Sequence, residues 1–237
     1  MEQDIFDHFR GGVTAEDACP YLPGRRWRNL ILDAGELFTP PVHEYLLNQG
    51  FRRMGNFVYR PTCDGCIECR PLRVSVASFQ PSRGQRRVQK RNDDIELSMT
   101  PAAYTEEKRE LLARYLEARH DGPMTADEPS MREFMYASPG TTLCMDYRLD
   151  GRLVGSGVVD LLPDVVSSIY FFFDPDLARR SLGTFSMLQE IELARSLGRR
   201  FFHPGFFISS CAAMSYKSFF KPCEYLHADG DWRPFSA

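Results

Sequence analysis

Three cysteines in one short segment are the residues of this chain whose spacing most clearly suits metal chemistry. Cys63, Cys66 and Cys69 stand in the run TCDGCIEC, with two residues between neighbours. Tight turns, helped by Gly65, would let three thiolates converge on one small ion or cluster. The spacing therefore predicts a metal site, and the alternative is three surface thiols without a metal.

A closed site of this kind needs a fourth ligand. Cys19, in the turn-like segment ACPYLPG of the same half of the chain, is the expected one. Thiolate-only ligation suits both zinc and an iron–sulfur cluster, so both stay open as the possible cofactor. Cys144 is expected in the core of a strand, and Cys211 has no histidine at a spacing that would make it a protease-type nucleophile.

A run of basic residues without an acid follows the cysteines. Such charges repel one another unless an anion is near, and a phosphate backbone is the natural partner. The run lacks the interleaved aromatic residues of a base-stacking surface, so it predicts phosphate contact and not base readout. The alternative is internal pairing with the acids at positions 93, 94 and 96. The basic residues are Arg70, Arg73, Arg83, Arg86, Arg87, Lys90 and Arg91.

The composition limits the classes of protein. The chain has 237 residues, 43% of them hydrophobic, and a formal net charge of -3. This charge gives no global attraction to nucleic acid, so any such attraction must be local. No apolar run is long enough to span a membrane, and the first residues lack the apolar core of a signal peptide. An odd count of seven cysteines without such a signal favours reduced thiols in the cytoplasm.

A second candidate for chemistry lies near the C-terminus, in HPGFFISSCAAMSYKSFFKP. Met214, Tyr216 and Lys217 share one short predicted helix with the aromatic residues Phe219 and Phe220. A tyrosine–lysine pair is usually packing plus a surface charge. Here the lysine stands in a markedly apolar run, so it is expected to need a polar partner.

These candidates must be positioned by a C-terminal half with the rhythm strand, turn, strand, turn, strand, helix, strand. Asp150 and Gly151 form a good hairpin turn, and the helix is expected over residues 182–197 with Gly198 as its stop. The segment ARRSLGT, residues 178–184, opens this helix and offers free backbone N–H groups to an anion. The pattern predicts an α+β fold, a mixed sheet with flanking helices like that of the acetyltransferases.

The N-terminal half is expected to be a smaller α+β region that carries the cysteines. Strands are predicted near residues 28–33, 56–60 and 72–77, and a helix near 40–49. The basic segment after them is predicted as a loop or short helix. Further helices are expected over 101–119 and from Ser130, where Ser130 and Glu133 match a capping box. We place the boundary between two regions, 1–100 and 101–237.

Several ordered blocks together resemble one family. They are CPYLPGR, YRPTCDGCIECRPLRV, FQPSRGQRRVQKRN, RHDGPM, FFFDPDLARRSLGTFSMLQEIELARSLG and PGFFISSCAAMSYKSFFKP. The chain is similar to the arginyl-tRNA–protein transferase superfamily, and within it to the bacterial subgroup that transfers leucine to aspartate or glutamate. Ala213 stands where that family often has lysine, but Tyr216 and Lys217 match its motif.

The resemblance implies an aminoacyltransferase of the N-degron pathway. Its substrates would be aminoacyl-tRNA, by subgroup Leu-tRNA, and proteins with N-terminal Asp or Glu, which the transfer would mark for degradation. The donor is an activated ester, so the chemistry requires no cofactor, only alignment of amine and ester and support for an oxyanion. No membrane and no DNA partner is expected.

The residues we expect in this site follow from the motif and the charge pattern. Tyr216 and Lys217 would line the reaction cleft. Acceptor selectivity demands a buried cation, with Lys217, Arg73 and Arg87 as equal candidates. The expected contacts to tRNA or substrate are Arg73, Arg86, Arg87, Arg91, Arg179, Arg180 and Gly183.

Three other functions stay open on the sequence. Arginine could replace leucine as the transferred residue. The loop at 178–184 could bind the pyrophosphate of CoA in a small-molecule acyltransferase. The chain could also be a metal-bearing RNA-binding module without enzymatic activity, although that would leave its C-terminal half unexplained.

Overall fold

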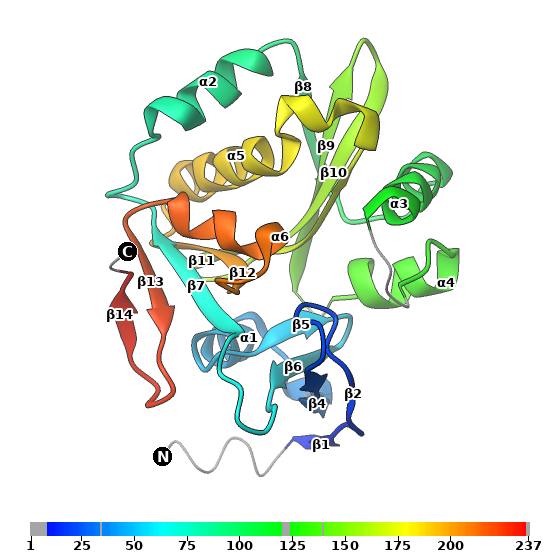
Figure 1. Cartoon of the computed structure of the whole chain (residues 1–237). Coiled ribbons are helices and arrows are strands. Elements are labelled where there is room, and N and C mark those ends of the chain that lie inside the picture. The colour runs from blue at the N-terminus through cyan, green and yellow to red at the C-terminus, as the bar shows by residue number, and fades with distance from the viewer. Residues whose placement is uncertain (1–8, 34, 120–123, 139, 236–237) are drawn as a thin grey trace.

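The main sheet has eight strands and occupies the centre of the molecule (Figure 1). The computed structural model describes residues 9–33, 35–119, 124–138 and 140–235. In spatial order the strands are β14 (Trp232–Pro234), β13 (Cys223–Leu226), β7 (Arg70–Ser75), β12 (Phe201–Phe207), β11 (Val165–Phe173), β10 (Arg152–Leu161), β9 (Thr141–Leu149) and β8 (Glu96–Pro101).

One pair of neighbours in this sheet is parallel. β11 and β12 run side by side and are joined by the helix α5 (Leu182–Ser196), whereas the other paired strands are antiparallel. A parallel pair needs such a crossover because the chain must return to the starting edge. Antiparallel strands followed by a strand–helix–strand unit confirm the predicted α+β, acetyltransferase-like fold.

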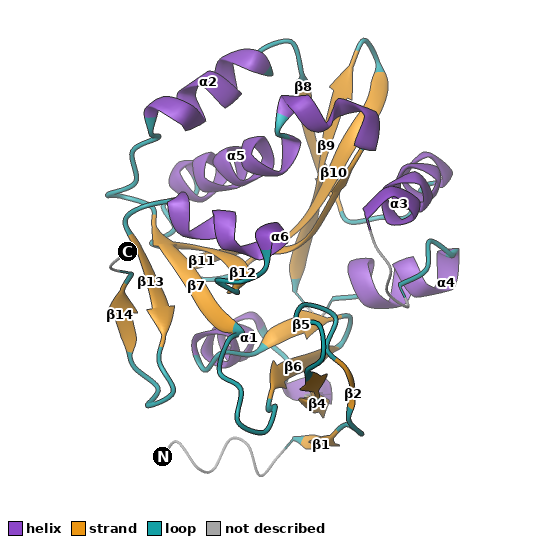
Figure 2. Cartoon of the chain, viewed as in Figure 1, coloured by secondary structure: helices purple, strands orange, loops and turns teal. Residues whose placement is uncertain are grey.

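Helices cover both faces of the sheet (Figure 2). On one face α5 contacts β10, β11 and β12 and carries Phe185, Leu188 and Ile191 into the larger core. The helix α2 (Arg83–Arg91) lies against α5. On the other face α3 (Glu106–Arg119) contacts β10 and β11 through Leu111 and Leu112. The alternation of side chains along each strand supplies both cores.

A smaller sheet lies below the main one in Figure 1. Its order is β1 (Arg10–Val13), β4 (Asn29–Asp33), β6 (Phe57–Pro61) and β5 (Arg52–Met54). The helix α1 (Pro40–Asn48) packs on it, and Phe38, Leu46, Phe51 and Val58 share a core. The two short strands β2 (Asp17–Ala18) and β3 (Arg26–Trp27) pair beside it.

Two sheets are tied together by one buried ion pair. Arg53 of β5 donates from Nε and Nη2 to the two carboxylate oxygens of Asp160 in β10, at 2.6 and 3.0 Å. Its remaining N–H groups reach the carbonyls of Gly55, Met135 and Ala137. Every N–H group of the Arg53 guanidinium therefore has an acceptor, as a buried charge requires.

Two of the expected helix starts are wrong. The region 101–105 is not helical, because β8 extends to Pro101 and pairs with β9, and α3 begins at Glu106. The next helix, α4 (Glu128–Met131), does not begin at Ser130. Asp127 caps it by accepting the Ser130 backbone N–H at 2.9 Å, and Ser130 lies within the first turn. An aspartate three residues earlier is an equally good cap, so the capping-box pattern was misplaced.

The other predicted elements are confirmed within a few residues, among them α1, β4, β6, β7 and α5. The basic segment is the helix α2. The boundary near residue 100 stays a prediction, and segments from both sides of it share the main sheet, since β7 lies between β12 and β13. In the part of the chain that the structure describes, no helix combines the length and apolarity that a membrane crossing requires.

Candidate active site

The candidate site lies where the two parallel strands separate. β11 and β12 pair only from Val165 to Ser167 and from Phe201 to His203. Both strands then continue, β11 toward Phe173 and β12 toward Phe207. Backbone groups on the facing edges beyond that point need other partners, because an unpaired buried carbonyl is costly. Two cationic side chains supply such partners.

Lys217 binds the β12 side of this opening. It belongs to η5 (Tyr216–Phe219), which follows the short helix α6 (Ala212–Ser215). Its Nζ donates to the carbonyl of Phe206 at 3.2 Å and lies 3.3 Å from the sulfur of Met214. Burial lowers the pKa of Lys217 to about 7, assisted by the Arg52 cation and opposed by Glu190. The partner predicted for this lysine is thus a strand carbonyl.

Tyr216 faces the start of α5. A Cβ atom on Gly183 would lie 3.5 Å from the Tyr216 hydroxyl, so that hydroxyl stands over the first turn of the helix. Burial is the main cause that raises the pKa of Tyr216, and Glu190 adds to it. The phenol is therefore a neutral donor at physiological pH. The structure brings together Tyr216, Lys217 and Gly183, all three named from the sequence.

Two further residues of the site were missed. Arg52 binds the β11 side, where it donates to the carbonyl of Ser168 and, at 3.3 Å, to the hydroxyl of Ser167. Glu190 of α5 accepts from the Ser186 hydroxyl at 2.7 Å. Burial raises the pKa of Glu190, against the pull of nearby Lys217 and Arg52. A polar residue inside an apolar helix face is a signal that could have found Glu190.

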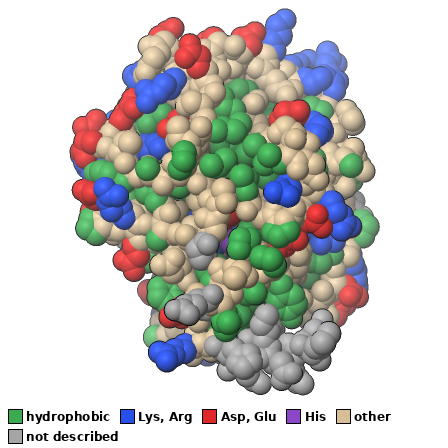
Figure 3. Space-filling model, turned by 180° about the vertical axis from the view of Figure 1, so that it is seen from behind, with side chains coloured by type: hydrophobic (Ala, Val, Ile, Leu, Met, Phe, Trp, Pro, Cys, Tyr) green, Lys and Arg blue, Asp and Glu red, His purple; other side chains and the backbone are tan. Residues whose placement is uncertain are grey.

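The basic residues of α2 are exposed and lie beside the loop before α5. In the part of the chain that the structure describes, none of them pairs with an acid, and the carboxylate of Asp94 binds Arg180 instead, at 2.7 and 2.9 Å. Seen from behind, basic side chains gather at the upper right, the side on which α2 lies (Figure 3). The residues are Arg83, Arg86, Arg87, Lys90 and Arg91.

Helix α2 is fixed to η4 (Pro175–Arg180), the turn that leads into α5. Arg91 donates to the Arg179 carbonyl at 2.6 Å, and Asn92 donates to the Arg180 carbonyl at 2.9 Å. Arg180 returns a bond to the Arg91 carbonyl at 3.0 Å. Two basic segments far apart in sequence therefore form one surface, with the side chain of Arg179 exposed and that of Arg180 engaged by Asp94.

Arg73 lies elsewhere. Its Nε donates to Glu224 at 2.6 Å, and its guanidinium lies 4.2 Å from the Phe201 ring and 4.3 Å from the Trp232 ring. It lines a cavity of about 290 Å³ that also includes Arg200 and Asp164. Phe201 opens β12, whereas Lys217 binds near the other end of that strand. The structure does not bring Arg73 to the strand opening.

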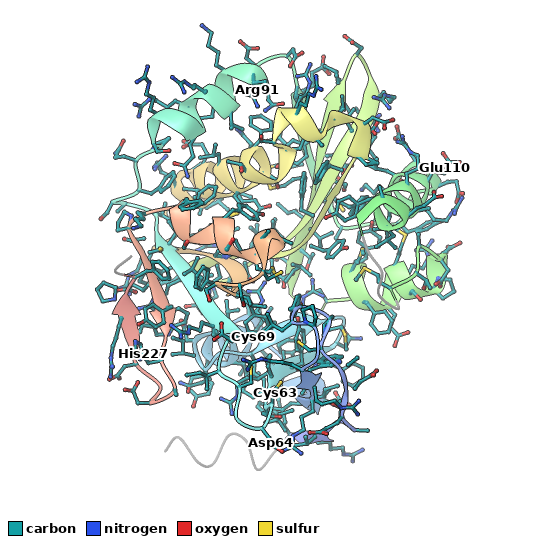
Figure 4. All side chains as sticks on the ribbon, viewed as in Figure 1. Cys63, Asp64, Cys69, Arg91, Glu110 and His227 are labelled. Carbon is teal, nitrogen blue, oxygen red and sulfur yellow. The ribbon has the colours of Figure 1, made fainter. Side chains whose placement is uncertain are left out.

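The cysteine loop forms a neighbourhood of thiols. Figure 4 shows Cys63 and Cys69 close together between β6 and β7, far from Arg91 at the end of α2. Burial raises the pKa of Cys69 to about 12, with additions from Cys63, Cys19 and Cys66, so the four thiols lie near one another. All seven cysteines are free thiols.

These thiols do not fit a metal in the present arrangement. Among the residues described, no group of three or more His, Cys, Asp or Glu side chains is placed to hold a metal ion. The sulfur of Cys63 instead lies 3.8 Å from the carbonyl of Arg28. We therefore derive no step of the reaction through a metal.

The arrangement at the strand opening suits acyl transfer to an amine. A lysine with a pKa of about 7 can exchange a proton near neutrality. The neutral phenol of Tyr216, over the first turn of α5, can donate to a developing oxyanion. The exposed basic surface beside α5 can hold a phosphate backbone.

Comparisons with known proteins agree with this chemistry. Residues 17–87 match the family described as arginine-tRNA-protein transferase, N terminus, and residues 107–227 match its C terminus. The chain belongs to the arginine-tRNA-protein transferase family. This confirms the predicted family and the transferase class. The two matched regions together include every residue of the strand opening named above.

Three relatives that align over most of their length carry the same name. The aspartate/glutamate leucyltransferase of Chromohalobacter salexigens is 44% identical over 93% of this chain and 91% of its own length. Those of Marinobacter nauticus and Pseudomonas fluorescens are 40% and 38% identical, over 94% and 90% of this chain and 95% and 92% of their own lengths.

Two solved structures are similar at low identity. The crystal structure of FemX is 8% identical with a TM-score of 0.47, over 84% of this chain and 80% of that one. The C-terminal domain of a putative lysylphosphatidylglycerol synthetase from Agrobacterium fabrum is 14% identical with a TM-score of 0.46, over 70% of this chain and 58% of that one.

Proposed function

We propose that this protein transfers leucine from Leu-tRNA to the N-terminal amine of proteins that begin with Asp or Glu. The observation that carries the proposal is the 44% identity to an aspartate/glutamate leucyltransferase over 93% of the chain. The site geometry supports the reaction class independently, since it offers a proton acceptor and a hydrogen-bond donor beside a basic surface.

The reaction is aminolysis of an ester. The neutral α-amine attacks the ester carbonyl, a C–N bond forms, and the C–O bond to the tRNA ribose breaks. Lys217 accepts the proton that the attacking amine loses, and this proton passes to the leaving ribose oxygen. The reference pKa of the amine, about 7.7–8.0, leaves enough neutral amine for this at cytoplasmic pH.

Tyr216 and the basic surface complete the proposed roles. The Tyr216 hydroxyl donates to the oxygen of the tetrahedral intermediate. The side chains of Arg86, Arg87, Arg91 and Arg179 contact tRNA phosphates, and Gly183 lets the acyl end approach the backbone of α5. Arg180 orders this surface through Asp94. The transfer marks the acceptor for degradation, in the cytoplasm.

The donor is tested with radiolabelled Leu-tRNA and Arg-tRNA offered separately to a peptide that starts with Asp. We expect the leucine label alone to reach the peptide. Transfer of arginine instead would favour the second candidate, which the description of the matched family names. Activity that saturates with CoA esters and not with charged tRNA would overturn both.

For the cysteines we propose that Cys63, Cys66, Cys69 and Cys19 bind a zinc ion or an iron–sulfur cluster. Binding would require the four thiols to come closer together than they are in this structure. Metal and labile sulfide are measured on protein purified without oxygen. Stoichiometric metal that is lost in a Cys66→Ser variant supports the site. If the purified protein is free of metal and still has full transfer activity, the proposed metal site is refuted.

A further inference from the structure

A buried arginine without a carboxylate partner stands at the strand opening. Arg52 is buried, with only 7% of its surface exposed. Its hydrogen bonds go to two neutral groups, the Ser167 hydroxyl and the Ser168 carbonyl. In the part of the chain that the structure describes, no carboxylate lies within ion-pair distance of it.

The adjacent residue shows what a compensated arginine looks like in this protein. Arg53 is 4% exposed and holds the Asp160 carboxylate in a two-pronged bond. The two arginines follow one another on β5 and point to opposite faces, as alternation in a strand requires. Among the described residues, Arg53 has a carboxylate in ion-pair contact, whereas Asp160 and Glu190 act on Arg52 only from a longer distance.

Lys217 lies at the same spot as Arg52. A Cβ atom on Gly205 would lie 3.4 Å from the Lys217 Nζ and 3.7 Å from Nη2 of Arg52, so both cations border the same spot. No described carboxylate forms an ion pair with Lys217 either. Glu190 acts on both side chains electrostatically, while its hydrogen bonds go to the side chains of Ser186 and Ser168. A buried guanidinium without a carboxylate in direct contact is costly, and an entering anion would lower that cost.

We propose that Arg52 is the specificity-determining residue that binds the side-chain carboxylate of the acceptor's N-terminal Asp or Glu. This inference rests on the proposed function. Arg52 and Lys217 flank one glycine, and the side-chain carboxylate and α-amine of one amino acid are separated by only a few bonds. The carboxylate can thus meet the guanidinium fork while the amine meets Lys217.

The other candidates for this role are occupied or lie outside the opening. Arg73 is paired with Glu224, and Arg87 is exposed on α2. A tRNA phosphate is the competing anion for Arg52. The exposed cations of α2 offer phosphates a site without burial, whereas a planar carboxylate fits a recess that holds one buried fork.

The test compares Arg52→Gln and Arg52→Lys with the unchanged protein, on peptides that start with Asp, Glu, Asn or Gln. We expect the ratio of kcat/KM for Asp over Asn to fall roughly 30-fold or more in Arg52→Gln, as for loss of one partner of a buried hydrogen-bonded charge pair. Arg52→Lys should give an intermediate ratio, because it keeps the charge and loses the fork.

The ratio separates recognition from folding. A merely structural role of Arg52 would lower transfer to all four peptides equally and leave the ratio unchanged, which would overturn the inference. Arg60→Gln is the matched control. Arg60 is a half-buried arginine of the same small sheet that lies over the Phe51 ring and donates to the Gln49 carbonyl, and its loss should not change the ratio.

Two further outcomes are decisive. A higher KM for Leu-tRNA with an unchanged Asp-to-Asn ratio would assign Arg52 to the carrier and overturn the inference. If Arg52→Gln does not fold, the ratio measured with Arg52→Lys carries the test. Absence of leucine transfer by the unchanged protein would refute the proposed function itself, a result distinct from an unchanged ratio.

Discussion

At the residue scale, the proposed acyl transfer depends on the burial of one lysine side chain, that of Lys217. Lys217 could have remained an ordinary surface cation, but η5 places its ammonium against the Phe206 carbonyl. Burial then favours the neutral amine, since charge is disfavoured away from solvent. The same burial keeps Tyr216 protonated. Burial therefore favours the neutral form of both side chains.

The first prediction concerns pH. Because the pKa of Lys217 is lowered to about 7, its neutral form increases as pH rises through that value. We expect kcat at saturating substrates to rise from about pH 6 and to level off near about pH 8. Lys217→Ala should lower kcat by about 10²–10⁴-fold and abolish this dependence. A variant that keeps both the rate and the pH profile would exclude Lys217 as the proton acceptor.

The second prediction concerns the phenol. Tyr216→Phe keeps the ring and removes only the hydroxyl that stands over Gly183. Loss of one donor to an oxyanion typically costs about 10²–10³-fold in kcat. We expect a loss of that size with little change in KM for Leu-tRNA, measured by steady-state kinetics. Tyr225→Phe, on β13 between β14 and β7, serves as the control, and an equal loss there would contradict the assignment.

The residue scale also shows what the sequence could reveal. Tyr216, Lys217 and Gly183 could be proposed as site residues from the sequence because a local motif and a helix-opening loop carry them. Arg52 could not, because its position at the strand opening depends on β5 meeting β11. For Glu190 the sequence held one signal, a polar residue inside an apolar helix face. A pair of arginines on a short strand is equally typical of a solvent-exposed edge.

At the element scale, the helix α2 carries exposed basic side chains, and its hydrogen bonds to η4 fix its position beside α5. Ser82 and Gln85 form a capping box, which starts the helix despite Gly84. This signal was in the sequence, but Gly84 inside the segment left loop and helix equally acceptable. The helix expected over 101–119 included Pro101, whereas in the structure Pro101 ends the edge strand β8.

The third prediction concerns this basic surface. Arg86→Ala combined with Arg87→Ala should raise KM for Leu-tRNA and leave kcat at saturating tRNA unchanged. The slope of log KM against log salt should decrease by about one for each phosphate that the variant no longer binds. Arg132→Ala is the control, since Arg132 is equally exposed but pairs with Glu128. An unchanged salt slope in the double variant would remove α2 from the tRNA interface.

At the scale of the whole molecule, the ion pair between Arg53 and Asp160 is a buried charged link between the two sheets. Arg53 and Asp160 are separated by 107 residues in sequence, so local patterns could not pair them. The hydroxyl of Thr142 also donates to Asp160, at 2.6 Å. Removing one partner would leave the other buried and uncompensated.

The fourth prediction is a matter of stability. Arg53→Met should lower the free energy of unfolding by about 3–5 kcal/mol, the usual cost of breaking a buried pair from one side. Urea unfolding followed by circular dichroism measures it. The exposed pair between Arg132 and Glu128 is the comparison, where Arg132→Ala should cost at most about 1 kcal/mol. Similar losses for both variants would show that the Arg53 bond is not a principal tie.

The cysteine loop and the basic helix α2 are far apart in the whole molecule (Figure 4). The two motifs are close in sequence, but β7 carries the chain across the main sheet between them (Figure 4). The cysteine loop lies at one end of this strand, and α2 follows beyond the other. Adjacency in sequence therefore did not predict adjacency in space.

The position of β7 also sets the order in which the protein can assemble on the ribosome. Both of its partners, β12 and β13, begin after residue 200, so β7 leaves the exit tunnel long before either exists. The backbone N–H and C=O groups of β7 lack their strand partners during that interval, and its apolar residues Leu72 and Val74 lack their final packing. Such long-range pairing makes folding slow and exposes strand edges to aggregation. Completion of the sheet is thus a late event of synthesis, and the strand opening that holds Lys217 forms with it.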